Sequence, residues 1–201
     1  MKRIAYLSVF VLFISTSNIL GQEVYTAIPE GSSMKIEGTS TLHDWDMTVE
    51  KFNCDVDLIL GNPSTTIEKV NFTGISSAIS SHSSLMDNKS HDALKTSKYP
   101  EIRFNMLSPL KVESKGNNFS GTATGKLFIA GKSQTVSLPF TGKRTSDNTI
   151  TITGSKKIDM TEFGIDPPTA MFGTLKTGKD VTVIYTLNLK ESGGELNASV
   201  K

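Results

Sequence analysis

The chain has 201 residues, of which 21 are lysine or arginine, 20 are aspartate or glutamate, and 37% are hydrophobic. The net charge is therefore close to zero, so electrostatic attraction does not favour binding to nucleic acid or to an anionic membrane surface. The length suits one domain with a full-sized hydrophobic core.

The first residues are typical of a secretory signal peptide. Two basic residues precede an apolar run over 4–14, and small and polar residues follow. The run is shorter than the roughly 18 apolar residues that span a bilayer, so we expect no membrane segment after cleavage, which falls between Ser17 and Gly21. The protein would then be exported, either to the periplasm or out of the cell. The chain divides into a signal peptide at 1–21, a folded domain at 22–191 and a flexible C-terminal tail at 192–201.

From Met34 onward, apolar and polar residues alternate with the two-residue period of β-strands. The alternation changes parity across 50–51, which predicts a bulge or tight turn there. Cys54 is the only cysteine, so it forms no disulfide within the chain, and its phase with apolar neighbours indicates a small buried hydrophobe. A turn at 61–64 leads to a further strand region over 67–79.

One stretch of the expected mature chain has a helical pattern. Four apolar residues recur at helical spacing and can share a face: Leu85, Met86, Ala93 and Leu94. Ser84 with Asp87 three residues on resembles a capping box. The helix must end before Pro100, because the residue preceding proline leaves the α region. We predict a helix over 85–97, followed at once by a strand over 101–107, and place the helix against a sheet or barrel near an opening.

The second half of the chain contains several strands separated by polar turns. One of them carries a face of apolar and small residues: Phe119, Gly121, Ala123, Gly125, Leu127 and Ile129. If this face points inward, its small residues leave unfilled volume. Pro139 in the next strand fits an edge or a bulge better than a central position, because proline has no N–H for the ladder. A turn at 146–148 follows, and the last strand, which includes Val183 and Tyr185, alternates most regularly.

These patterns predict roughly eight to ten antiparallel strands joined by short turns, with no repeat and no linker. Such a chain forms a β-sandwich or a closed barrel, and closure removes the exposed edges of long strands. A barrel of about eight strands is just wide enough to be filled by side chains or to hold one small ligand. Whether the interior is filled therefore decides the function.

Few residues could carry catalysis or bind a metal. The three histidines, His43, His82 and His91, lack the paired spacing of zinc sites. Asp87 and His91 do share one helix face. No serine lies in a nucleophile elbow, and no Ser, His and Asp are joined by a recognisable motif. We therefore expect neither a metal site nor an enzyme, and a metal-dependent enzyme is the least favoured alternative.

Two stretches are candidates for binding. The only tryptophan, Trp45, either plugs the core or covers a ligand at a barrel rim, where His43 or Asp44 would meet a polar head group. The segment 157–178 is long, apolar and without strand periodicity, so its side chains must be buried against something. It either closes one end of the barrel as ordinary core or forms a flap over a cavity. Its clustered apolar residues are Met160, Phe163, Ile165, Met171, Phe172 and Leu175.

Five motifs follow one another along the chain: S-T-L-H-D-W at 40–45, M-D-x-K-x-H-x-A-L-K at 86–95, Y-P-x-I-x-F at 99–104, G-x-L-x-I-A-G-K at 125–132 and M-T-x-F-G-I at 160–165. Together with the signal peptide, they resemble the YceI-like family of exported bacterial proteins, also called polyisoprenoid-binding proteins, over residues 34–190. Met86 stands where many members carry an arginine, so no charge role is carried over to it. The resemblance implies an all-β, extended antiparallel, lipocalin-like barrel of about eight strands, with one short α-helix packed at its side, that holds an isoprenoid or another long-chain lipid.

We therefore expect a lipid-binding protein that carries or stores an isoprenoid first, and a fatty-acyl lipid second, in the cell envelope, with no other cofactor. The ligand tail would thread the barrel, gated by the helix and the 160–175 loop, with Trp45 and His43 beside the head group. The candidate ligand-binding residues are His43, Trp45, Met47, Phe72, Met86, Leu94, Phe104, Met106, Leu127, Ile129, Phe140, Phe163, Met171, Val183 and Tyr185. The alternative is a ligand-free interaction module with a solid core, serving an envelope complex or a stress response. The sequence leaves the oligomeric state open, a homodimer included.

Overall fold

The computed structural model describes residues 23–145 and 149–192. The expected signal peptide, the expected turn at 146–148 and all but the first residue of the expected tail lie outside them. In chain order the elements are β1 (Glu23–Ser40), β2 (Trp45–Val49), β3 (Phe52–Ile59), β4 (Ser64–Ile75), the 3₁₀ turn η1 (Ser76–Ala78), β5 (Ile79–Ser80), α1 (Ser84–Leu94), β6 (Glu101–Met106), β7 (Leu110–Lys115), β8 (Asn118–Ile129), β9 (Lys132–Arg144), β10 (Thr149–Asp159), η2 (Met160–Phe163), β11 (Thr169–Ala170), η3 (Met171–Gly173) and β12 (Leu175–Glu191).

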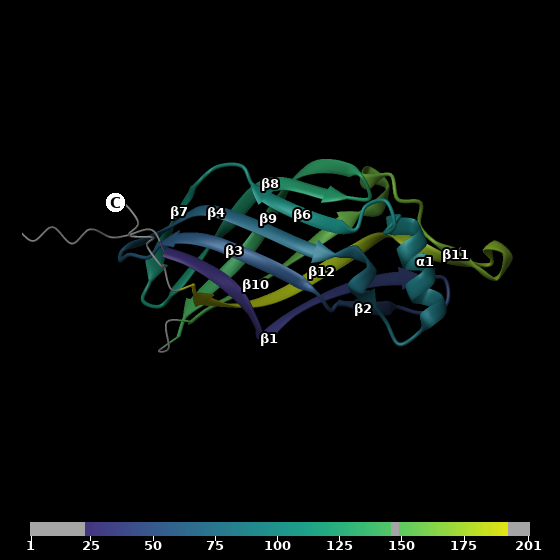
Figure 1. Ribbon diagram of the computed structural model, residues 1–201, viewed down its shortest axis with the longest axis horizontal. Helices are drawn as coiled ribbons and strands as arrows, with labels where there is room; N and C mark the ends of the chain where they lie inside the picture. Colours follow the sequence, from purple (N-terminus) through teal and green to yellow (C-terminus); the bar gives the residue numbers. More distant parts are fainter. Residues whose placement is uncertain (1–22, 146–148, 193–201) are drawn as a thin grey trace, which may run out of the picture.

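Eight strands close into an antiparallel barrel, which confirms the predicted all-β, lipocalin-like architecture with one short helix (Figure 1). Around the barrel the strands follow the order β1, β12, β10, β9, β8, β6, β4 and β3, and β3 returns to β1. Four further strands extend this frame: β2 pairs with β1, β5 with β2, β7 with β4 and β8, and β11 with β12. Among the described residues there is no helix with both the length and the apolar character needed to cross a membrane.

β1 is longer than the sequence predicts. It begins at Glu23 rather than near Met34. Its first half pairs with β3, its second half pairs with β2, and both halves pair with β12. A register shift separates the halves around Gly31, which adopts a φ of +74°. Such an irregularity exchanges the two faces of a strand, so it hides the first half of β1 from a search for strict alternation.

Two predicted irregularities are confirmed. The parity change at 50–51 is the tight connection between β2 and β3, where the Lys51 carbonyl accepts a hydrogen bond from the Ile75 amide at 2.9 Å. Pro139 lies just where β9 stops pairing with β10, since that ladder ends at Phe140 and Gly154. Beyond this point β10 is hydrogen-bonded to β12 alone. The wall of the barrel is therefore not closed by backbone hydrogen bonds between the first part of β9 and the last part of β10.

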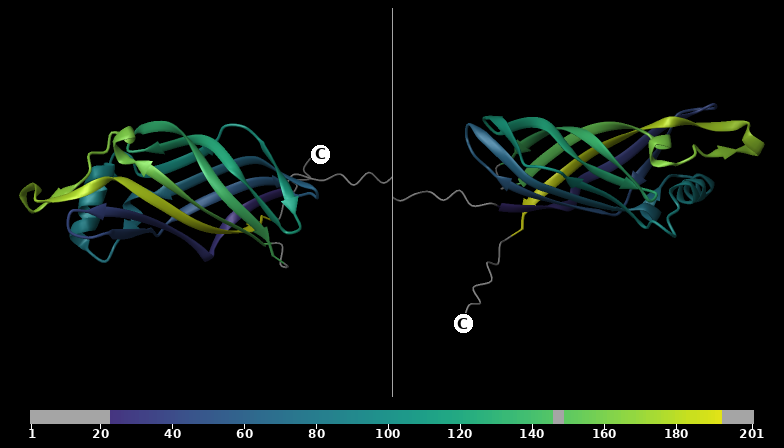
Figure 2. Two further views of the ribbon diagram at one scale, coloured as in Figure 1. Left: turned by 180° about the vertical axis from the view of Figure 1, so that it is seen from behind. Right: turned by 90° about the horizontal axis from the view of Figure 1, so that it is seen from above.

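α1 packs against the barrel at one end, near its opening, as predicted (Figures 1 and 2). Met86, Ala93 and Leu94 pack against the barrel core, as the shared apolar face predicts, but Leu85 remains 63% exposed. None of the helix residues is fully buried. The helix therefore covers an opening without filling it.

The ends of α1 differ from the prediction. The N-cap is Ser83, whose hydroxyl accepts from the Met86 amide at 3.4 Å, so the predicted capping box at Ser84 is wrong by one residue. Asp87 accepts instead from the backbone amide and the hydroxyl of Ser81, both at 2.7 Å. The helix stops before 97 because Lys95 takes a left-handed conformation with φ 55°, which ends a helix in the same way as a C-terminal glycine.

The two ends of the barrel are filled to different degrees. The end that carries the β3–β4 and β7–β8 hairpins is closed by a cluster of buried residues, some of which also line the interior: Tyr25, Cys54, Val56, Leu58, Ile67, Val112, Phe119, Ile150, Leu187 and Leu189. The opposite end carries α1, the β1–β2 loop, η2 and the β11–β12 hairpin (Figure 2). The loops and the helix that border the cavity therefore lie at the α1 end.

The small residues of β8 point inward, and Ala123 lines the interior, but the two glycines do not leave open volume as predicted. A Cβ at Gly125 would lie 2.3 Å from two ring carbons of Phe104, so that ring already occupies the space above the glycine. Aromatic rings cover further glycines in the same way: Phe119 on Gly142, Trp45 on Gly38, Tyr185 on Gly154 and Tyr99 on Gly131. Rings that cross to glycines on neighbouring strands are a known means of stabilising sheets. Here the aromatic rings occupy the space beside the glycines.

Candidate functional site

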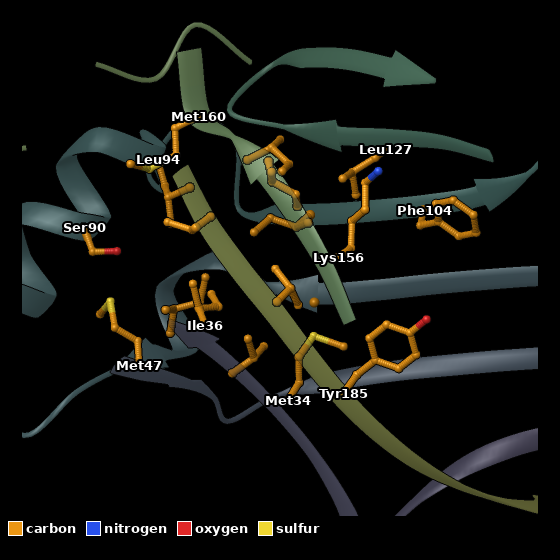
Figure 3. A pocket seen from close by; sticks show the side chains of 18 of the residues that line it. Met34, Ile36, Met47, Ser90, Leu94, Phe104, Leu127, Lys156, Met160 and Tyr185 are labelled. Carbon is orange, nitrogen blue, oxygen red and sulfur yellow. The ribbon is translucent and has the colours of Figure 1, made fainter. Parts of the chain in front are cut away.

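The barrel nevertheless encloses a cavity of about 540 Å³ (Figure 3), a size typical of sites for small molecules. Inward-facing apolar side chains of the barrel strands form its walls. Ser40 at the end of β1, His43 from the β1–β2 loop, Leu85 from α1 and Thr169 from the β11–β12 hairpin line its mouth. The cavity is therefore closed at one end by the packed cluster and bordered at the other by loops and α1.

All but two of the predicted ligand-binding residues line this cavity: His43, Trp45, Met47, Phe72, Met86, Leu94, Phe104, Leu127, Ile129, Phe140, Phe163, Val183 and Tyr185. Met106 is not part of the lining and packs against two core clusters. Its register partner is Gly125, the site that the Phe104 ring covers. The side chain of Met171 lies outside the described residues.

Sequence reasoning missed several lining residues. Met34 and Ile36 line the cavity from β1, opposite Tyr185 and Val183 of β12 in the register. Lys156 of β10 also lines it. Lys156 is in phase with the inward residues Ile150, Ile152 and Ile158, so the two-residue period alone could have found it.

Trp45 lies at the rim. Its indole Nε1 donates to the Thr39 carbonyl at 3.0 Å, and its ring covers Gly38. The β1–β2 loop beside it is held by Ser40, whose hydroxyl donates to the His43 carbonyl at 2.7 Å. Trp45 is half-buried and lines the cavity, so it forms part of the mouth rather than a plug in the core.

The segment 157–178 divides into two parts, and only the first is core. Phe163 and Ile165 are buried beside the cavity, and Met160 packs against the same cluster. Phe172, which was expected to be buried, is fully exposed at the tip of the β11–β12 hairpin. This hairpin projects beyond the barrel (Figure 1), so no other element is near enough to cover the ring.

Two polar side chains on the cavity wall are held in their neutral forms. Burial raises the pKa of the Cys54 thiol to about 12, so the thiol is protonated at neutral pH and is a poor nucleophile. Burial also raises the pKa of Tyr185 to about 12, and the nearby Cys54 adds to this effect. The Tyr185 hydroxyl donates to the Pro139 carbonyl at 3.0 Å. Neither group is prepared for acid–base chemistry at pH 7.

Two of the histidines are engaged by backbone carbonyls. His43 Nδ1 lies 2.7 Å from the Asp44 carbonyl, and His91 Nε2 lies 2.8 Å from the Ile79 carbonyl across the α1–β5 contact. Across residues 23–145 and 149–192, no group of three His, Cys, Asp or Glu side chains is placed to hold a metal ion. His91 thus ties α1 to β5.

Residues 25–189 match the family model of the YceI-like domain, and no curated protein matches the chain. Several solved structures share its fold. BcnA from Burkholderia cenocepacia aligns with a TM-score of 0.64 at 17% identity, over 81% of this chain and 98% of that one. A polyisoprenoid-binding domain from Saccharophagus degradans, implicated in plant cell wall breakdown, aligns with a TM-score of 0.63 at 9% identity. The alignment covers 85% of this chain and 99% of that one. The YceI protein of Campylobacter jejuni aligns with a TM-score of 0.55 at 19% identity, over 74% of this chain and 85% of that one.

Proposed function

The chain belongs to the YceI-like domain family, and from this membership and the cavity we propose that it is a non-catalytic lipid carrier of the cell envelope. It would hold an isoprenoid or another long-chain apolar molecule inside the barrel. The observation that carries this proposal is the cavity of about 540 Å³, whose walls are mostly apolar and whose lining includes loop and helix residues at the α1 end. The polyisoprenoid-binding domain that shares its fold supports an apolar ligand.

The energetics are sufficient without a conspicuous polar motif. Burial of one CH₂ group contributes about 0.8 kcal/mol, so ten buried carbons contribute about 8 kcal/mol before the costs of ordering the ligand. An apolar cavity of this kind stays dry or takes up an apolar guest. The alternative of a solid-cored interaction module predicts no cavity, and the cavity therefore counts against it.

Neighbouring positions on β12 supply a matched test. Val183 lines the cavity, whereas Ile184 points out of the barrel and is 38% exposed. Val183→Trp should fill part of the cavity, and Ile184→Trp should add the same ring outside. We expect mass spectrometry of an organic extract of protein purified from its native host to find lipid with wild type and Ile184→Trp, and little with Val183→Trp. A reproducible absence of lipid from wild type, or equal lipid in both variants, contradicts the proposal.

Carriage requires exchange with a membrane, and the mouth has the side chains for contact with a bilayer. Leu42, Leu85 and Phe172 are exposed on the three elements that border the mouth, the β1–β2 loop, α1 and the β11–β12 hairpin, and Phe172 is exposed completely. Exposed apolar side chains on neighbouring elements around one opening are a feature of membrane interaction sites. Their insertion into the headgroup region would hold the mouth against the bilayer.

This part of the proposal is tested by flotation with vesicles of phosphatidylethanolamine and phosphatidylglycerol. We expect Phe172→Ser combined with Leu42→Ser to reduce the bound fraction several-fold without a change in thermal stability. Leu107→Ser is the control, because Leu107 is 55% exposed but follows β6 on the barrel wall. Equal binding by the rim variant and the control would rule out the rim as the contact.

Export is a further part of the proposal, supported by the basic and apolar pattern of the first residues. The protein should be recovered from the periplasm or the medium, with a mature N-terminus that follows a residue between Ser17 and Gly21. N-terminal sequencing of fractionated cells measures this directly. A cytoplasmic protein that retains Met1 would contradict it.

A further inference from the structure

Lys156 is the one charged side chain on an inward position of β10. The inward series of this strand runs Ile150, Ile152, Gly154, Lys156 and Ile158. Figure 3 shows the Lys156 side chain standing among the apolar side chains of the cavity wall. The strand residues that line the cavity are mostly apolar, and the other lysine of the lining, Lys89, comes from α1 and is exposed. A lysine on the strand wall therefore calls for a physical reason.

The neighbouring lysine shows what an ordinary surface lysine of this strand does. Lys157 points outward and forms an ion pair with Asp180 at 2.9 Å. Lys179 on β12 pairs with Asp159. Within the part of the chain that the structure describes, no carboxylate forms an ion pair with Lys156. The ammonium of Lys156 therefore stands at the cavity wall without a counter-ion from the protein.

The barrel wall explains how this charge is tolerated. β9 pairs with β10 only as far as Gly154, so the backbone next to Lys156 has a hydrogen-bonded neighbour on the β12 side alone. Lys156 is half-buried rather than fully buried. A long alkyl stem can lie along apolar surface while the ammonium keeps access to water. The side chain can therefore keep its terminal nitrogen in contact with water and still reach a ligand inside the barrel.

We propose that Lys156 binds an anionic head group, so that the ligand is a long-chain acid, either a carboxylate or a phosphate monoester, rather than a neutral isoprenoid. The inference rests on the proposed lipid carriage. It adds a charge requirement that an apolar lining alone does not impose, because a carboxylate or phosphate oxygen forms a charge-assisted hydrogen bond with an ammonium.

The register gives the depth of this contact. Lys156 pairs with Val183, which pairs with Ile36, and these residues form one level of the wall. Trp45 lies one level nearer the mouth, because its partner Gly38 pairs with Val181. Lys156 lies six positions along β10 from Ile150 at the closed end, which is about 20 Å along the strand. A head group at Lys156 would thus lie just inside the mouth, with the tail directed toward the closed end.

Four probes test the inference: palmitic acid, farnesyl monophosphate, and the neutral alcohols hexadecanol and farnesol. Binding is followed by Trp45 fluorescence and by calorimetry. We expect wild type to bind each acid about tenfold to a hundredfold more tightly than the corresponding alcohol. Lys156→Met should bind acid and alcohol with equal affinity, and its affinity for the alcohols should match that of wild type. Lys156→Arg should retain the ratio, and Lys157→Met is the matched control on the outer face. The larger of the two ratios distinguishes a carboxylate from a phosphate ligand.

The outcomes separate the two proposals. If wild type binds all four probes and Lys156→Met leaves the acid-to-alcohol ratio unchanged, the head-group role is overturned and lipid carriage stands. If wild type binds acids and alcohols with equal affinity, the head-group role is likewise overturned and lipid carriage stands. If wild type binds none of the probes, lipid carriage is overturned and the head-group role falls with it. Circular dichroism confirms that Lys156→Met is folded, which we expect because the change extends an apolar wall.

Discussion

Gly125→Ala tests how the interior of the barrel is filled. The new Cβ would lie 2.3 Å from the Cε2 and Cζ atoms of Phe104 and 2.6 Å from the carbonyl oxygen of Asn105. Carbon atoms in favourable contact lie about 3.5–4.0 Å apart. The Phe104 ring must therefore retreat by more than about 1 Å, and the backbone oxygen of Asn105, which belongs to a paired strand, has little freedom to follow.

The magnitude follows from the surroundings of the ring. Phe104 is only 3% exposed and is packed on its protein side, so the open direction is toward the cavity. Overpacking of this kind costs about 1–3 kcal/mol. For a domain of this size, each kcal/mol lowers the melting temperature by about 2–4 °C, so we expect a fall of about 2–12 °C. Because the displaced ring enters the cavity, lipid uptake should fall as well.

Thermal unfolding followed by circular dichroism measures the first effect, and lipid extraction measures the second. Thr124→Ala is the control, since Thr124 is the exposed neighbour on the same strand. Adding Phe104→Leu to Gly125→Ala removes the ring from the new methyl group and should restore part of the lost stability. An unchanged melting temperature in Gly125→Ala would refute the reasoning, because the glycine would then border open volume.

Three further predictions concern ionisable groups. The Cys54 thiol, with its pKa raised to about 12 by burial, should react with Ellman's reagent at pH 8 roughly a thousandfold more slowly than free cysteine, and fast labelling would contradict its burial. The hydrogen bond from Lys179 lowers the pKa of Asp159 to about 2, so this group stabilises the fold above about pH 4 and loses that contribution as the pH falls toward 2. The melting temperature of Asp159→Asn should therefore change less with pH over this interval than that of wild type. An identical dependence on pH in the two proteins would exclude the contribution. Asp87→Ala removes the acceptor of two hydrogen bonds from Ser81 and should lower the unfolding free energy by about 1 kcal/mol, measured by urea denaturation, whereas no loss would show that the start of α1 is held by other contacts.

Local patterns predicted most of the architecture. The alternation of β8 and β12 placed the right residues on the inner face, and the parity change at 50–51 located a real turn. The position of Pro139 was interpreted correctly because proline removes a ladder hydrogen bond wherever it stands. The prediction failed at the first half of β1, where the shift around Gly31 breaks the period.

The candidate site was predicted less completely, and for a different reason. Inward phase selects residues that can line a cavity, but it does not say which of them are covered by a neighbour. Met106 has the same phase as Phe104, yet it packs in the core. Phe172 belongs to an apolar segment, yet it is exposed because the β11–β12 hairpin projects from the barrel.

The sequence by itself determined most of the strands, their inward faces and the presence of one helix before Pro100, because periodicity and backbone restrictions act over a few residues. The tertiary structure decided that the barrel is hollow, that rings from one strand fill the glycine gaps of another, and that Lys156 stands beside Val183 without a counter-ion. A cavity is the difference between the volume that closed strands enclose and the volume that their side chains occupy. That difference depends on the pairing of strands far apart in the chain, which no local pattern contains.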